Sequence, residues 1–94
     1  MSEQICISAI IPFYNAEKHI NNCISSLLAQ DFKKSFEIIM VDDASNDESK
    51  NIISTYNIPF LKLLSLQSNS GQSTARNLGI ENAEGKYVFF MDVD

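Results

Sequence analysis

The sequence is short of basic residues and of long apolar runs, and each shortage excludes a class of protein. Seven lysines and arginines stand against twelve aspartates and glutamates, a formal net charge of −5, so no extended basic surface is available to bind a nucleic-acid backbone. The longest wholly apolar run, residues 87–91, is too short to cross a membrane, and the amino-terminal residues lack the basic start of a signal peptide. We therefore expect a cytoplasmic protein without a nucleic-acid partner or transmembrane segment, and with at most peripheral membrane contact.

Several familiar site motifs are also missing. Cys6 and Cys23 have no CxxC spacing, and His19 is the only histidine, so we expect two buried, reduced thiols rather than a zinc site. We expect His19 to be an exposed residue on the polar side of a helix rather than a catalyst. No GxGxxG follows the first apolar run and no Walker lysine is present, so the main support for dinucleotide-binding and P-loop domains is absent.

The chain does contain four short apolar runs, which we interpret as strands buried on both faces. They cover residues 5–11, 36–41, 60–66 and 87–91, and are rich in β-branched and aromatic residues. We expect Pro12 to end the first strand. Three helical patterns lie between the runs, and we expect Asn15 to cap the first helix, Ser45 and Glu48 to form a capping box for the second, and Gly85 to end the third in a left-handed conformation.

This alternation predicts a single α/β domain over residues 1–94. The fold would be Rossmann-like, with three α/β/α layers and a mainly parallel four-stranded sheet in the order 3-2-1-4, because right-handed crossovers must bring the two acidic strand ends together. Ligands of such sheets bind beyond the carboxyl ends of the strands. The residues that directly follow each apolar run are therefore the candidates for a site.

Four aspartates follow two of the predicted strands: Asp42, Asp43, Asp92 and Asp94. Carboxylates about 4 Å apart repel each other by roughly 4 kcal/mol at an effective dielectric constant of 20, so such a cluster should hold a proton or a cation. Oxygen ligands favour Mg²⁺ or Mn²⁺, and Mg²⁺ commonly combines one or two carboxylates with water and substrate phosphate. The alternative is that the aspartates are turn and cap residues, which we consider at least as good for Asp42 and Asp47.

Two further side chains are candidates for binding a nucleotide. Tyr14 can present an aromatic face to a flat base, although it can equally pack against the first helix. Arg76 lies one turn into the third predicted helix, where it can reach a phosphate oxygen near the N–H groups of Ser70 and Gly71. A solvated surface arginine is an equally good interpretation of its spacing.

The ordered segments ISAIIPFYNAEKHINNCISSLLAQDF, FEIIMVDDASNDES and NSGQSTARNLGIENAEGKYVFFMDVD together resemble the nucleotide-binding half of a family 2 glycosyltransferase with the GT-A fold. The resemblance covers essentially the whole chain. It implies that Pro12 and Tyr14 line the nucleotide pocket, that Asp43 accepts a hydrogen bond from the base, and that Arg76 lies near the diphosphate or sugar.

The same resemblance identifies the terminal DVD as the D-x-D motif of this family. It implies that Asp92 lies toward the ribose or sugar and that Asp94, with Asp92 beside it, binds Mn²⁺ or Mg²⁺. The implied donor is a nucleotide-diphosphate sugar, with a UDP-sugar favoured, and the implied reaction is an inverting transfer to an acceptor hydroxyl in the synthesis of a cell-surface polysaccharide or glycoconjugate.

The family's general base comes from an acceptor-binding half that lies beyond D-x-D. We therefore name no catalytic base and expect the isolated chain to be a truncated GT-A fold that binds donor without turnover and exposes surface that drives self-association. Two alternatives remain open: a phosphoaspartate protein of the haloacid dehalogenase or receiver type, in which the first aspartate of DVD is a nucleophile, and a non-enzymatic nucleotide-binding module.

Overall fold

The chain alternates strands and helices, as the sequence predicts. The computed structural model describes residues 4–30 and 35–94, and within them the elements run in the order β1 (Ile7–Phe13), α1 (Ile20–Leu28), β2 (Phe36–Asp42), α2 (Ser49–Ser54), β3 (Leu61–Ser65), α3 (Gln72–Asn82) and β4 (Tyr87–Phe90). All strand pairs are parallel, and the sheet order is β3-β2-β1-β4. The predicted fold class and strand order are confirmed.

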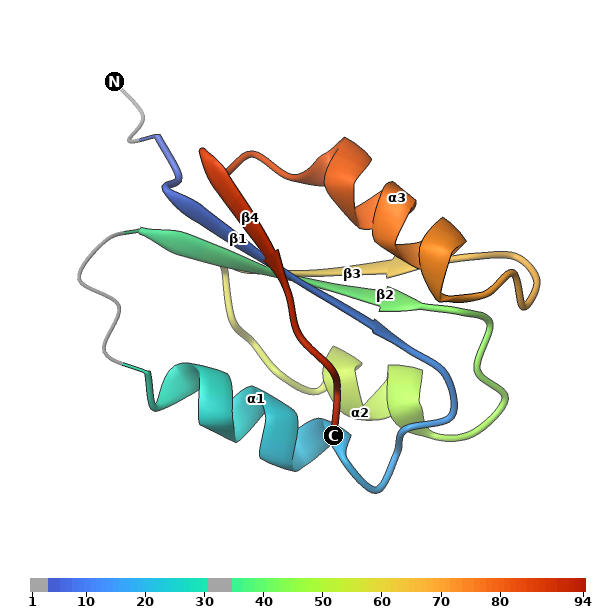
Figure 1. Cartoon of the computed structure of the whole chain (residues 1–94). Helices are drawn as coiled ribbons and strands as arrows, with labels where there is room; N and C mark the ends of the chain where they lie inside the picture. The colour runs from blue at the N-terminus through green and yellow to red at the C-terminus, as the bar shows by residue number, and fades with distance from the viewer. Residues whose placement is uncertain (1–3, 31–34) are drawn as a thin grey trace.

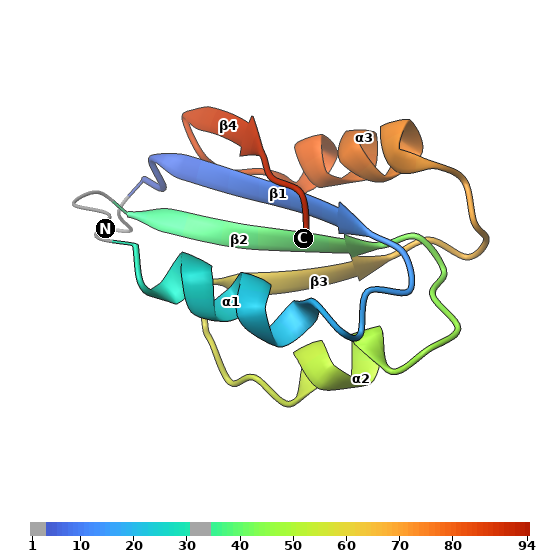
Figure 2. The same cartoon turned by 60° about the horizontal axis from the view of Figure 1, so that its bottom comes forward.

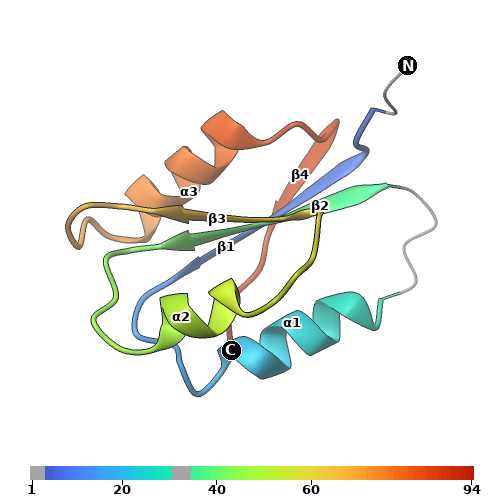
Figure 3. The ribbon, with the colours of Figure 1, turned by 180° about the vertical axis from the view of Figure 1, so that it is seen from behind.

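Helices cover both faces of the sheet (Figure 1, Figure 2). Helices α1 and α2 lie on one face and α3 lies on the other, and the view from behind in Figure 3 shows the same three layers. Successive side chains of a strand point to opposite faces, so Ile11 of β1 packs in the cluster with α1 while its neighbour Ile10 packs in the cluster with α3. The two central strands therefore bury nearly all of their side chains.

The outer strands are less buried than predicted. All four residues of β4 are exposed, and Tyr87 keeps 60% of its surface accessible. The reason is the topology: β4 is an edge strand that pairs with β1 on one side only, and α3 contacts β1 and β2. A strand buried on both faces was therefore the wrong interpretation of this apolar run.

Pro12 lies inside β1 and does not end it, contrary to the prediction. The carbonyl of Ile10 accepts the N–H of Met91 on the β4 side, whereas Phe13 accepts the N–H of Asp43 on the β2 side. The backbone N–H and C=O groups of successive strand residues point alternately to the two neighbouring strands. The backbone nitrogen of Pro12 therefore faces the β4 side, beyond the last β1–β4 register pair at Phe90. Its missing N–H therefore removes no ladder hydrogen bond.

The predicted caps of the first two helices are wrong. Asn15 precedes α1 by several residues and has a positive φ of 49°, and the capping residue of α1 is His19, without a side-chain cap. Ser45 and Glu48 do not bond to each other as a capping box; instead, the Ser45 Oγ accepts the N–H of Asn15 at 2.8 Å. Side chains of the types that often cap helices instead form hydrogen bonds between two loops here, and the local spacing of residues does not predict such partners.

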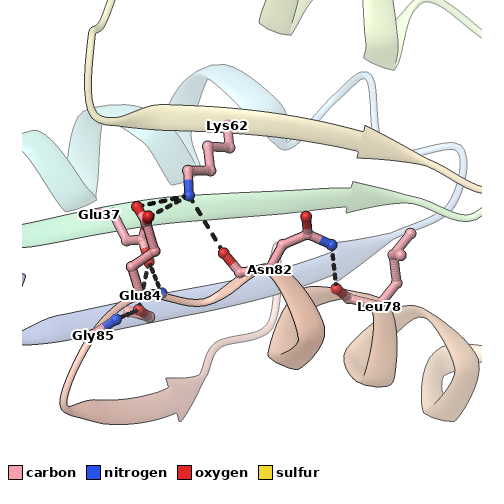
Figure 4. Close-up of polar contacts among 7 residues, drawn as sticks. Glu37, Lys62, Leu78, Asn82, Glu84 and Gly85 are labelled. Carbon is pink, nitrogen blue, oxygen red and sulfur yellow. Dashed lines mark hydrogen bonds and ion pairs between the residues drawn. The ribbon is translucent and has the colours of Figure 1, made fainter.

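The end of α3 is fixed by a buried polar network rather than by a left-handed Gly85. The Gly85 N–H donates to the Ser8 Oγ at 2.8 Å, and the Ser8 hydroxyl donates to Glu37 at 2.7 Å. Glu37 is 1% exposed and also pairs with Lys62, 3.0 Å away (Figure 4). Among the described residues, Gly71 is the glycine with positive φ. Gly85 is needed because a Cβ there would lie 2.6 Å from the Ser8 backbone nitrogen.

Both cysteines are free thiols, as predicted, although only Cys23 is fully buried. Burial raises the pKa of the Cys23 thiol, which keeps it protonated and unreactive. Within residues 4–30 and 35–94, no helix has both the length and the apolar character needed to span a membrane.

Candidate functional site

A cavity of about 340 Å³ opens at the carboxyl end of the sheet. Its walls come from the loop after β1, the end of β2, the start of α3 and the segment that follows β4. This strand-end cavity brings together five of the predicted site residues: Pro12, Tyr14, Asp43, Asp92 and Asp94. Residues from three separate strand ends therefore meet at the place that the topology predicted.

Asp43 lies in the wall of this cavity, and both of its carboxylate oxygens accept hydrogen bonds from the backbone. Its Oδ1 accepts the N–H of Ser70 at 2.7 Å and its Oδ2 accepts the N–H of Gly71 at 3.0 Å. The residue is 6% exposed. The anion at the start of α3 is therefore Asp43, which occupies the N–H groups of Ser70 and Gly71. Each carboxylate oxygen has two lone pairs, so acceptor capacity remains for a ligand.

Asp42 does not join the strand-end cavity, although it is adjacent to Asp43. It is 2% exposed, and its Oδ1 accepts the N–H of Ser45 at 2.9 Å. Asp47 likewise accepts the N–H of Ser49 at 2.9 Å. Both aspartates thus have the turn and loop roles that formed the alternative interpretation of their positions.

Asp92 and Asp94 form the acidic side of the strand-end cavity. Both are exposed, whereas Val93 between them packs against the cluster under α1. This alternation anchors the segment through Val93 and leaves the two carboxylates toward solvent. A second cavity of about 350 Å³ shares Asp92 and Asp94 with the first and is bounded by α1 through His19 and Cys23.

The described residues contain no cluster of three or more histidine, cysteine, aspartate or glutamate side chains able to hold a metal ion. Asp92 and Asp94 still fit a divalent cation of the Mg²⁺ type, because such ions take one or two carboxylates and complete their shell with water and phosphate oxygens. Two carboxylates that line one cavity beside an open ligand space match that requirement.

Tyr14 and Pro12 form the other side of the cavity. Tyr14 is 48% exposed and Pro12 is buried. An exposed ring next to a buried, rigid proline is available for stacking on a planar group. The two halves of the cavity thus differ in chemistry, with an aromatic surface on one side and carboxylates on the other.

Arg76, like Asp42, does not line this cavity. Its guanidinium donates to Gln72 at 3.2 Å and lies 5.7 Å from the centre of the Phe90 ring. Its Nε is buried without a hydrogen-bond partner among the residues described. Gln72, one turn earlier on α3, does line the cavity. Arg76 therefore lies beside the cavity, and its Nε–H is available to donate to a ligand.

Three polar residues that line the cavity were not predicted to do so: Asn15, His19 and Gln72. Asn15 was interpreted as a helix cap and His19 as an exposed residue of a helix. The available signal was position: each lies within three residues of a predicted site residue or a predicted helix start at the carboxyl end of the sheet.

A parallel sheet with a cavity at its carboxyl ends, aromatic on one side and acidic on the other, places the chain in the class of α/β domains that bind ligands beyond their strand ends. Comparisons with known proteins narrow this class. The family model "Glycosyl transferase family 2" matches residues 8–94. The chain belongs to this family.

Two curated bacterial relatives illustrate the match. Poly(ribitol-phosphate) beta-N-acetylglucosaminyltransferase TarS of Staphylococcus aureus is 43% identical over 90 residues, which cover 93% of this chain and 16% of TarS. The uncharacterized glycosyltransferase YibD of Escherichia coli is 47% identical over 90 residues, covering 94% of this chain and 26% of YibD. The chain thus spans about a quarter or less of the length of these two relatives.

Solved structures confirm the GT-A fold. The crystal structure of TarS residues 1–349 in complex with UDP-GlcNAc superimposes with a TM-score of 0.89 at 42% identity, covering 96% of this chain and 27% of that one. The mannosyltransferase PcManGT of Pyrobaculum calidifontis, in complex with GDP-Man and Mn²⁺, has a TM-score of 0.88 at 24% identity and covers 99% and 28% of the two chains. The second likeness shows the fold alone. Family and fold together favour the glycosyltransferase interpretation over the phosphoaspartate and non-enzymatic alternatives.

Proposed function

We propose that residues 1–94 form the donor-binding part of an inverting glycosyltransferase and hold a nucleotide-diphosphate sugar in the strand-end cavity. The observation that carries the proposal is the meeting of Tyr14, Asp43, Asp92 and Asp94 in one cavity. An aromatic surface, a base-facing acceptor and a pair of carboxylates are the groups that a nucleoside diphosphate with its cation requires. Relatives that bind such ligands, including TarS with UDP-GlcNAc, support the choice.

In this proposal the base lies between Tyr14 and Asp43. Tyr14 stacks on its face, and Asp43 accepts an N–H from its edge with the lone pairs that Ser70 and Gly71 leave free. A carboxylate that accepts from a base N–H favours uracil, which carries an N–H between its two carbonyl groups. We therefore favour UDP over CDP, because uracil carries an N–H at N3 where cytosine carries an acceptor nitrogen.

The diphosphate lies toward Asp92 and Asp94 together with Mn²⁺ or Mg²⁺. The cation supplies neutralisation of the negative charge that develops on the departing nucleoside diphosphate. Asp92 and Asp94 would hold the cation at one end of the cavity and so orient the diphosphate of the donor. Arg76 turns from Phe90 to place its free Nε–H near a phosphate or the sugar. Held in this way, the anomeric carbon is fixed for attack by an acceptor hydroxyl.

The TarS comparison suggests a role in building a cell-wall or cell-surface polymer. The general base and the acceptor site belong to the rest of the family's fold in this proposal, so the 94-residue chain binds donor without transferring sugar. The proposed location of the reaction is the cytoplasm.

Calorimetric titration tests the proposal. The 94-residue chain is titrated with UDP, CDP and GDP, each with Mn²⁺ and with a chelator. We expect binding of UDP that Mn²⁺ strengthens, weaker binding in Asp94→Asn with Mn²⁺ present, and weaker binding of CDP than of UDP. Equal affinity for UDP and CDP would contradict the base site, and UDP binding that is unchanged by chelator would remove the metal from the proposal.

A further inference from the structure

The loops after β1 and β2 are joined by reciprocal hydrogen bonds between backbone and side chains. The N–H groups of three consecutive residues after β1 donate to three side chains before or at the start of α2; the bonds run from Asn15 to Ser45 (2.8 Å), from Ala16 to Ser49 (2.8 Å) and from Glu17 to Asp47 (3.2 Å). Two bonds run the other way, from the N–H of Asn46 to Asn15 (2.9 Å) and from the N–H of Glu48 to Glu17 (3.3 Å). We call these five bonds the loop clamp.

The loop clamp adjoins the strand-end cavity on both sides. Tyr14 directly precedes Asn15, and Asp43 lies two residues before Ser45. Between Asp43 and Ser45, Ala44 adopts a positive φ of 63°, a conformation that a residue with a Cβ keeps only when its surroundings impose it. The loop clamp therefore fixes the backbone that directly follows each of the two residues that face the nucleotide base in the proposed function.

Asp47 is the residue of the loop clamp that best distinguishes an effect on the position of the loops from a direct contact with the ligand. It does not line the strand-end cavity, yet its Oδ2 accepts from Glu17 in one loop and its Oδ1 accepts from Ser49 in the other. Desolvation raises the pKa of the Asp47 carboxyl, but the hydrogen bonds from Ser49 and Glu17 outweigh it and the pKa is lowered. The hydrogen bonds from the two loops thus stabilise the ionised carboxylate of Asp47.

We propose that Asp47 and Ser45 are positioning residues for donor binding, because the loop clamp holds Tyr14 and Asp43 at the separation that the nucleotide base requires before the ligand arrives. This inference rests on the proposed function and deepens it. A loop held in its bound conformation spares the ligand the cost of ordering it, which is why preorganisation raises affinity without adding a contact. If one or two clamp bonds are lost, UDP binding should weaken on the order of tenfold. The reason is that the ligand must then order roughly one additional residue, and the entropy cost of ordering one residue corresponds to about that change in the dissociation constant.

The experiment compares UDP dissociation constants, with Mn²⁺ present, for the parent chain and the variants Asp47→Ala, Asp47→Asn and Ser45→Ala. Ser8→Ala is the matched control, since it removes one buried and one partly buried hydrogen bond at the opposite end of the sheet and so lowers stability without changing either loop. Circular dichroism establishes the temperature range in which every variant is folded, and amide hydrogen exchange of Asn15, Ala16 and Glu17 follows the clamp directly.

We expect Asp47→Ala and Ser45→Ala to weaken UDP binding and to accelerate exchange in the loop after β1, with Asp47→Asn intermediate because its amide keeps one acceptor oxygen. Ser8→Ala should lower the unfolding temperature and leave the dissociation constant within twofold of the parent. If folded Asp47→Ala and Ser45→Ala both bind UDP as the parent does, the positioning role is overturned while the proposed function stands. If the parent itself binds no nucleotide, the proposed function fails, and the positioning role fails with it.

Discussion

The Oδ2 of Asp43 accepts the backbone N–H of Gly71 at 3.0 Å, across a sequence separation of 28 residues. With the second bond from Ser70, this contact ties the end of β2 to the start of α3. A carboxylate at the positive end of a helix stabilises both the helix and the charge. Asp43 therefore has a structural role, beside the base recognition that we propose for it from the family resemblance.

Replacing Asp43 by Asn should lower both stability and UDP affinity. An amide offers one acceptor oxygen, so one of the two N–H groups would face an NH₂ donor, at a cost of about 1 to 3 kcal/mol for the unpaired group. Urea unfolding and UDP titration measure the two effects separately. An Asn variant of parental stability would contradict the contact with the start of α3, and a stable variant of parental affinity would contradict the base site.

Ala44→Gly should stabilise the chain. Ala44 has φ of 63°, a conformation that costs a residue with a Cβ about 1 to 2 kcal/mol. Glycine removes this cost, but its greater conformational entropy in the unfolded chain offsets about 0.4 to 1 kcal/mol of the gain. The net gain expected is therefore about 0.5 kcal/mol, measured by urea unfolding. Asn15→Gly is the matched comparison at φ of 49° and should destabilise, because it removes the acceptor for the N–H of Asn46.

Gly85→Ala should cost more stability than Gly79→Ala. A Cβ at position 85 would lie 2.6 Å from the backbone nitrogen of Ser8, whereas a Cβ at position 79 would meet the Ile10 side chain, also at 2.6 Å. Side chains yield more easily than a central strand, and alanine at position 79 regains about 1 kcal/mol of helix propensity. We expect a loss near 3 kcal/mol for Gly85→Ala and 0 to 2 kcal/mol for Gly79→Ala. Equal unfolding midpoints would contradict this ranking.

The buried network around Glu37 should make stability depend on pH in the acid range. Desolvation raises the pKa of Glu37, but hydrogen bonds from Glu84, Ser8 and Lys62, together with the Lys62 charge, lower it below its usual value. A lowered folded-state pKa means that the contribution is complete above the unfolded value of about 4.3 and is lost as pH falls through the folded value.

Measuring urea unfolding between pH 3 and 7 tests this sign, with the limits chosen to bracket the usual glutamate pKa of about 4.3. The difference in unfolding free energy between the parent and Glu37→Gln should shrink as pH falls. Glu84→Gln serves as the control, since that carboxylate is exposed and pairs with Lys62 at 3.2 Å, where ion pairs contribute little. A difference that stays constant across the range would show that the charge on Glu37 does not stabilise the fold.

The exposed edge of the sheet at β4 should cause self-association of the 94-residue chain. Tyr87, Val88, Phe89 and Phe90 are all at least 36% exposed on a strand with one unpaired side. Lysine on an edge strand opposes pairing between strands, so Val88→Lys should shift the chain toward monomer in sedimentation velocity. Asn77→Lys, which adds the same charge on the exposed side of α3, should not. A monomeric parent at high concentration would contradict the prediction.

The sequence was enough to predict the strand order and the position of the cavity, because periodicity, crossover handedness and the acidic ends of two strands all depend on local pattern. It was not enough for the caps. Asn15 and Ser45 have capping chemistry, but the partners of their side chains lie about thirty residues away along the chain, and spacing carries no information about such partners. The same limit applies to Gly85, whose need for a small side chain comes from Ser8, and to Arg76, whose direction is set by Phe90.

The pairing of β4 with β1 also determines when the cavity comes into existence during folding. Ile7 lies opposite Tyr87 in the register, so the acidic side of the cavity reaches its aromatic side only through a pairing between the first and last strands. Contacts of such high sequence separation form late and slowly, because the entropy of closing the intervening chain must be lost first. During synthesis, the first three strands can pair before the cavity is complete, so in the proposed function nucleotide binding requires that the last strand has docked.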